Sequence, residues 1–187
     1  MVTFEPPRGM ADGADPWKAV GLSRSGMSRF VRAAQEAVGL EGEVDVLLTD
    51  DRTLWRLNRA YRGKDKATDV LSFPAVEDVA ETFAGDLAIS VDTAKKQAAE
   101  QGHSLRDEVR ILVLHGLLHL SGMDHEVDGG EMAEHEGLLR KAMRLPDGLI
   151  ARAEGKTKAK PTAKSSDAKG ETLKDKLRGV GRKKVAA

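Results

Sequence analysis

Hydrophobic residues recur at helical spacing in five segments of this chain and form short apolar runs in three others. Repeats every three to four residues are typical of amphipathic helices, and short runs bounded by Gly, Pro or Asp are typical of strands. The predicted helices cover residues 28–38, 52–61, 92–101, 105–120 and 129–143. The predicted strands cover residues 43–49, 70–73 and 85–90. A segment before Ser28 could contribute a fourth strand.

The segment 105–120 differs from the other predicted helices because it is apolar almost all round. Such a helix is buried on several sides, and Ser104 can cap its start. The helix at 52–61 instead carries one buried stripe, which consists of Leu54, Leu57 and Tyr61, widened by Trp55. We therefore expect an α+β fold in which a small mixed four-stranded sheet packs against about five helices around the buried central helix.

Length and composition indicate one folded domain with two flanking segments. The chain has 187 residues, of which 40% are hydrophobic and 32% charged, as in globular proteins. We expect a poorly ordered lead-in at 1–20, a folded domain at 21–150 and a disordered basic tail at 151–187. The tail holds twelve Lys or Arg against four Asp or Glu, which the formal net charge of zero conceals. It could bind nucleic acid or serve only as a solubilising extension.

The sequence contains neither a membrane-spanning segment nor the basic and apolar regions of a signal peptide. It also contains no cysteine, so disulfides are excluded and a reducing compartment is compatible with the composition. We therefore expect a cytoplasmic protein without a membrane partner.

Three of the five histidines fall within the segment HGLLHLSGMDH, at His115, His119 and His125. Two histidines four apart share one face of a helix, and Gly122 can end that helix in a left-handed conformation so that the chain returns with the third. Three imidazoles can hold one metal ion and leave a position open, which is typical of catalytic zinc sites. We expect one zinc ion per chain on the central helix, although nickel, copper or iron would also accept these ligands.

Other interpretations of this segment remain open. His115 and His119 could be core histidines satisfied by backbone carbonyls, with His125 in a loop. The spacing also matches that of the metzincin proteases, in which a glutamate follows the first histidine as general base. Gly116 occupies that position here and cannot accept a proton, which disfavours peptide hydrolysis. Asp124 could replace the base, but no spacing argument places it there.

A basic loop follows the second predicted helix, with Arg62, Lys64 and Lys66 beside Asp65 and Asp69. An arginine fork can bind a phosphate with two hydrogen bonds, and lysine acts as a mobile point charge. The loop could therefore hold a phosphodiester near the metal. The alternative is a solvated turn with scattered charges, which is common in proteins.

Four stretches in order resemble the bacterial YbeY family of metal-dependent endoribonucleases. They are LNRAYRGKDKATDVLSFP, GDLAIS, GHSLRDEVRILVLHGLLHLSGMDH and EMAEHEGLLRKAM, and together they lie within residues 44–143. The glycine after the first histidine and the aspartate before the third belong to this family's motif and exclude the metzincins. Where family members often have proline, this chain has Ala67, so the loop should be less rigid.

The resemblance implies a zinc ion on His115, His119 and His125, with Arg62 and His115 as catalytic residues and Arg62, Lys64 and Lys66 contacting RNA. It also implies single-strand-specific cleavage in ribosomal RNA maturation, at the 3′ end of the small-subunit RNA, and in ribosome quality control. The implied partners are ribosomal RNA, the ribosome or its small subunit, and ribosome-associated proteins.

A rival hypothesis is a ribosome-binding assembly factor whose metal is chiefly structural. The remaining histidines lie outside the triad, and we expect His103 near a helix start and His135 exposed on the last helix.

Overall fold

The computed structural model describes residues 1–5, 15–76 and 82–146. Along the chain, its elements are β1 (Val2–Phe4), α1 (Pro16–Ala19), α2 (Arg24–Val38), β2 (Glu43–Thr49), α3 (Asp51–Arg62), β3 (Val70–Pro74), β4 (Phe83–Ser90), α4 (Val91–Gln101), α5 (Leu105–Leu120) and α6 (Glu131–Ala142). Four strands and, among the described residues, five longer helices confirm the expected α+β class. The predicted basic tail and the connection at 77–81 lie outside the described residues.

The four strands form one mixed sheet in the order β1-β2-β4-β3. The pairs β1/β2 and β2/β4 are parallel, whereas β3 runs antiparallel to β4. β4 has no regular alternation of buried and exposed residues, since six of its eight residues are buried on one face or the other. The central position of β2 and β4 explains their apolar sequence.

The first residues of the chain belong to this sheet, so the expectation of a poorly ordered lead-in is wrong for Val2–Phe4. The side chains of Val2 and Phe4 are buried, and the amino group of Met1 donates to the carbonyl oxygen of Val44 at 2.7 Å. The same amino group forms an ion pair with Asp45. Residues 6–14 lie outside the described part of the chain.

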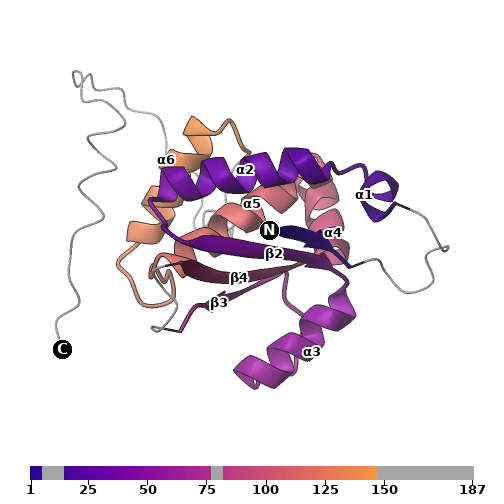
Figure 1. Cartoon of the computed structure of the whole chain (residues 1–187), viewed down its shortest axis with the longest axis horizontal. Helices are drawn as coiled ribbons and strands as arrows, with labels where there is room; N and C mark the ends of the chain where they lie inside the picture. The colour runs from indigo at the N-terminus through magenta and orange to yellow at the C-terminus, as the bar shows by residue number, and fades with distance from the viewer. Residues whose placement is uncertain (6–14, 77–81, 147–187) are drawn as a thin grey trace.

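Helices cover the two faces of the sheet unequally (Figure 1). The face toward α2, α5 and α6 carries the large core, whereas α3 lies against the other face, near β3 and β4. The helix α5 is central, since eleven of its sixteen residues are buried, and each fully buried leucine contributes about 1.5–3 kcal/mol. This confirms the prediction of a helix buried on several sides.

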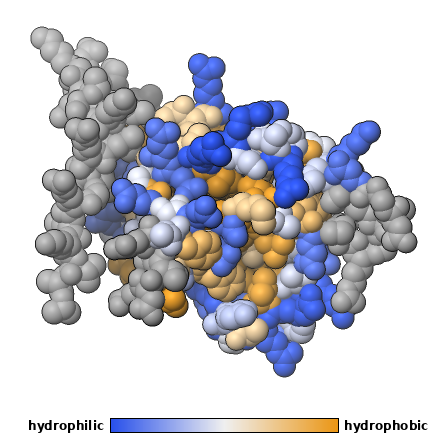
Figure 2. Space-filling model, viewed as in Figure 1, coloured by the Kyte–Doolittle hydropathy of each residue, from blue (hydrophilic) through white to orange (hydrophobic). Residues whose placement is uncertain are grey.

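The core under α3 is smaller and consists of Leu54, Leu71 and Ala88, with Leu57 and Phe73 partly buried beside it. Apolar side chains remain visible over the strands between α2 and α3 (Figure 2), because α3 covers only part of this face. Tyr61 was expected in the buried stripe, but it is 71% exposed. Its ring contacts only the margin of the small core, where it meets Phe73 edge-on with a centroid separation of 5.4 Å.

Helix starts follow side-chain caps that the sequence contains. Ser104 accepts a hydrogen bond from the backbone N–H of Asp107, as expected. The helix α2 begins four residues earlier than predicted because Ser23 accepts from the N–H of Gly26. Within the described residues, no helix is long and apolar enough to cross a bilayer.

Candidate metal centre

Three histidine side chains meet at the C-terminal end of α5. His115 and His119 lie one turn apart on this helix, and His125 follows in the next turn of chain. Each of the three offers a ring nitrogen, and these atoms lie within 4.8 Å of one another. The structure therefore confirms that the three imidazoles converge, so His115 and His119 are not simply core histidines satisfied by backbone carbonyls.

The turn that returns His125 is fixed by backbone and side-chain hydrogen bonds. Gly122 adopts φ 88°, a left-handed conformation that costs glycine little. The N–H of Met123 then donates to the carbonyl oxygen of Leu118 at 3.1 Å. Beyond it, Asp124 accepts from the N–H of Glu126 at 3.0 Å. The predicted stop at Gly122 is thus confirmed, and the local hydrogen bonds place the third ring beside the helix.

A buried carboxylate holds the first histidine. The Oε2 atom of Glu136, on α6, lies 3.0 Å from Nδ1 of His115, and Glu136 is 1% exposed. Its other oxygen lies 3.5 Å from Nη1 of Arg140. An imidazole that donates its Nδ1–H to a carboxylate presents the lone pair of Nε2, which is the usual arrangement behind a metal-ligating histidine.

Sequence reasoning missed Glu136. The one available signal is that Glu136 and Arg140 lie four apart on α6, on the side of the helix that also buries Met132 and Leu139. A buried charged pair of this kind points to a partner on another element. Its identity as His115 depends on the packing of α6 against α5, 21 residues away in sequence.

The separation of the first two rings fits a bound metal ion. Nε2 of His115 and Nε2 of His119 lie 3.2 Å apart, close to the separation of about 3.3 Å between two tetrahedral ligands of zinc. Burial, together with the neighbouring rings of His115 and His125, holds the pKa of His119 below its usual value. A neutral ring offers the lone pair that a cation requires.

Gly116 lies where any larger side chain would crowd the sheet. A Cβ atom at this position would lie 2.7 Å from Cδ2 of Leu87 and 3.3 Å from Oγ of Ser72. Position 116 therefore faces the sheet rather than the group of histidines. This packing gives a structural reason for the glycine and agrees with the exclusion of a metzincin mechanism.

An open cleft of about 650 Å³ lies beside the histidines. Its lining brings together segments that are far apart in sequence, namely Tyr61 and Arg62, most residues from Thr68 to Pro74, the three histidines and the turn at 122–126. Arg62 is exposed and forms no ion pair with any described residue. Its guanidinium is available to an anion in the cleft.

Lys64 and Lys66 lie outside the cleft that Arg62 lines. Both are exposed, and neither lines the cleft. The loop is nevertheless anchored, because Nδ2 of the buried Asn58 donates to the carbonyl oxygen of Lys66 at 2.8 Å. Asn58 is a second positioning residue that the sequence reasoning missed, although a polar residue among the buried positions of α3 could have indicated it.

His103 and His135, the two histidines outside the triad, do not contribute to the metal centre. His103 precedes α5, as expected, and its ring contacts the buried Glu108. The expectation that His135 is exposed is wrong, since it is 8% exposed. Both of its ring nitrogens lack a hydrogen-bond partner among the described residues, and burial lowers its pKa. It faces inward with Met132 and Leu139, its neighbours at helical spacing.

Fold and site together define a class: an α+β protein whose buried helix presents a three-histidine group, able to bind a metal ion, to an open cleft that carries an arginine. The chain belongs to the YbeY family, because the family model described as "Endoribonuclease YbeY" matches residues 22–144. The resemblance found from the motifs is thereby confirmed.

Relatives named endoribonuclease YbeY span most of the folded part. The chain is 49% identical over 152 residues to the protein of Koribacter versatilis, covering 81% of this chain and 95% of the relative. It is 53% identical over 112 residues to that of Nautilia profundicola, covering 60% and 80%. For the protein of Solibacter usitatus the identity is 49% over 133 residues, covering 71% and 88%.

Proposed function

We propose that this protein is a single-strand-specific endoribonuclease that uses one zinc ion held by His115, His119 and His125. Its proposed role is maturation of the 3′ end of small-subunit ribosomal RNA and ribosome quality control, in the cytoplasm, in contact with the ribosome or its small subunit and with ribosome-associated proteins. The observation that carries the proposal is the convergence of three imidazoles on a cleft that also contains Arg62. The names of the relatives support RNA as the substrate.

The residues of the chain divide the work as follows. A zinc ion in this site would supply Lewis-acid stabilisation of a phosphate oxygen and lower the pKa of a bound water. Glu136 fixes the ring of His115 so that Nε2 faces its partners. Arg62 binds the phosphate and neutralises the charge that builds on its oxygens, which in comparable sites contributes about 10²–10³ in kcat.

The identity of the nucleophile can be read from the products. Attack by the 2′-hydroxyl of RNA forms a new bond to phosphorus and expels the 5′-oxygen of the next nucleotide, which leaves a 2′,3′-cyclic phosphate. Attack by water leaves no cyclic end. End-group analysis of cleaved RNA separates the two routes.

The proposal is tested with the His119→Ala variant. We expect this variant to lose both zinc, measured by elemental analysis, and cleavage of ribosomal RNA. Contaminating nuclease is excluded by purifying wild type, His119→Ala and the control Arg32→Ala, an exposed residue of α2, by one identical procedure. A His119→Ala protein that cleaves RNA fully without metal would refute the assignment.

The assembly-factor hypothesis draws on a specific observation: Lys64 and Lys66 lie outside the cleft, where they could contact ribosomal phosphates without taking part in cleavage. The Arg62→Ala variant separates the two functions. We expect it to lose RNA cleavage and keep ribosome association. Retained cleavage with loss of ribosome association would favour the assembly factor.

A further inference from the structure

A row of arginines runs along the outer face of α3. Arg52, Arg56 and Arg59 follow one another at spacings of four and three residues and are all exposed. At 100° per residue they fall within about 60° of one another, on the side opposite the buried Leu54 and Asn58. We call these three residues the α3 arginine row.

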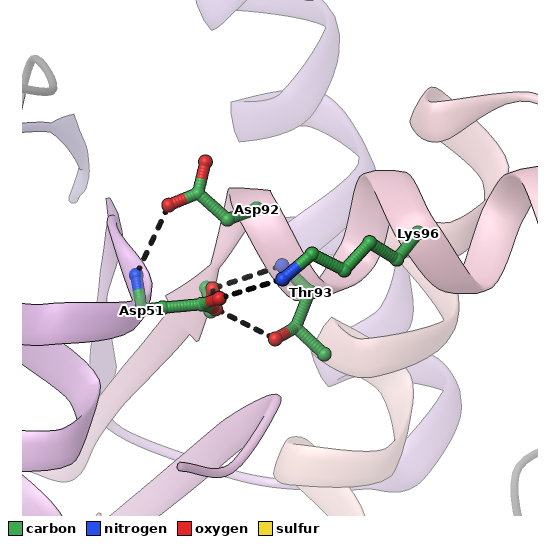
Figure 3. A network of polar contacts seen from close by, with 5 residues as sticks. Asp51, Asp92, Thr93 and Lys96 are labelled. Carbon is green, nitrogen blue, oxygen red and sulfur yellow. Dashed lines mark hydrogen bonds and ion pairs between the residues drawn. The ribbon is translucent and has the colours of Figure 1, made fainter.

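The arginines of the row have no direct carboxylate partner among the described residues. No described residue forms an ion pair with Arg52, Arg56 or Arg59. The nearest acidic side chain on the helix, Asp51, is occupied elsewhere: it accepts hydrogen bonds from Thr93 at 2.6 Å and Lys96 at 3.0 Å, and from Ser90 (Figure 3). Asp65, which follows the helix, accepts from the indole N–H of Trp55 at 2.8 Å.

This pattern differs from that of an ordinary solvated helix. On such a face charges usually alternate in sign, and like charges three or four residues apart oppose helix formation by about 0.2–0.5 kcal/mol per pair. The exposed face of α4 shows the usual mixture, with Asp92 and Glu100 among its lysines. The α3 row places like charges at consecutive helical spacings without such compensation, as expected of a surface that binds an anion.

The row leads to the cleft. Arg62, three residues after Arg59, lines the cleft beside the histidines, so the four arginines advance along the axis in steps of about 6, 4.5 and 4.5 Å. The guanidinium of Arg59 lies over the ring of Trp55, 5.6 Å from its centroid, which restrains it near this path. Regularly spaced cations beside an aromatic ring are the usual components of a surface that follows a single nucleic-acid strand.

We infer that the α3 arginine row binds the phosphates of single-stranded RNA next to the scissile bond and leads the strand into the cleft. The inference rests on the proposed ribonuclease function and extends it to a substrate path. The alternative occupant is an acidic protein segment, and RNA is preferred because Arg62, three residues after the row, lines the cleft beside the histidines.

The test measures binding of a fluorescent single-stranded oligouridylate of about twelve nucleotides, a length within the range of single-strand binding surfaces. Fluorescence anisotropy is recorded at several salt concentrations, with EDTA present to prevent cleavage. The variant combines Arg52→Gln, Arg56→Gln and Arg59→Gln. The matched control combines Arg29→Gln, Arg32→Gln and Lys141→Gln, which removes the same charge from exposed positions of α2 and α6, beyond the sheet from α3.

Three lost phosphate contacts should reduce the slope of log K against log salt by about 2 in the α3 variant, and weaken binding at least tenfold at low salt. The control variant should keep the wild-type slope. An α3 variant that keeps the wild-type slope, or equal losses in both variants, would overturn the inference. So would tight binding of polyglutamate by wild type that the α3 variant loses.

Cleavage distinguishes this inference from the proposed function. With metal restored, the α3 variant should show reduced kcat/KM on long RNA, whereas the matched control variant should cleave long RNA like wild type. If wild type cleaves no RNA while the change in salt slope is observed, the proposed function fails and the binding row stands. If wild type cleaves RNA and the slope is unchanged, the row fails alone.

Discussion

Replacing Glu136 by glutamine should weaken zinc binding without removing any ligand. The carboxylate of Glu136 accepts from Nδ1 of His115 at 3.0 Å and is almost fully buried. Glutamine has the same shape but no charge. The change therefore leaves an oxygen that can accept the Nδ1–H of His115 but removes the negative charge that raises the basicity of Nε2.

The expected size follows from comparable sites. Loss of such a hydrogen-bonded partner typically lowers metal affinity 10- to 100-fold, or about 1.4–2.7 kcal/mol. For Glu136 the loss of zinc affinity should lie toward the upper end of this range, because a buried carboxylate is poorly screened by solvent. The same change leaves the charge of the neighbouring Arg140 less compensated, so some loss of fold stability accompanies it.

The assay is a competition titration in which a chromophoric chelator of known affinity competes for zinc. Glu134→Gln is the matched control, since Glu134 lies two residues away on α6 and is exposed. Thermal unfolding of both variants without metal measures the stability change separately, so that it can be subtracted. A Glu136→Gln protein that is folded and binds zinc within about twofold of wild type would refute the role of Glu136.

Three further substitutions test other parts of the structure. His135→Leu should raise the free energy of unfolding by about 1 kcal/mol, because two buried ring nitrogens without described partners are removed. The folded pKa of His135 lies below 6.5, so wild type should lose stability relative to this variant as pH falls below 6.5, measured by urea unfolding; parallel pH profiles would contradict this. Asp51→Asn should destabilise by about 1–3 kcal/mol at pH 7, since its hydrogen bonds to Ser90, Thr93 and Lys96 outweigh burial and lower the pKa of Asp51. The difference between Asp51→Asn and wild type should shrink as pH falls below 3.8, and a pH-independent difference would argue against it. Gly116→Ala should lower the free energy of unfolding by about 1–3 kcal/mol, because the added methyl group contacts Leu87. An unchanged Tm would contradict this, since it would mean that Leu87 can move aside at little cost.

The parts of the fold that sequence predicted are those governed by local periodicity. The strand Glu43–Thr49 and the helix Leu105–Leu120 have the predicted bounds, because each contains its own pattern and stop signal. The edge strand Val2–Phe4 has only three residues, too few to show a period. Its position depends on parallel pairing with β2, which no local pattern encodes.

The candidate site divides in the same way. The convergence of His115 and His119 follows from helical geometry, and the return of His125 follows from a glycine turn. The partner of His115 could not be derived, because Glu136 reaches it only through the packing of α6 against α5. His135 was misplaced for the same reason: polarity suggests the surface, whereas the helix turns this residue toward the core.

The two halves of the site have different mechanical properties. His115 and His119 belong to the most buried helix, so their positions are fixed by the same contacts that stabilise the fold, and the C-terminal end of α5 carries the partial negative charge that favours a cation. Arg62 and the α3 arginine row lie on a helix with a small core and exposed cations. Substitutions around the histidines should therefore change metal binding and stability together. Substitutions on the outer face of α3 should change RNA binding while metal binding and fold stability stay unchanged. The role of each half of the site can therefore be measured independently.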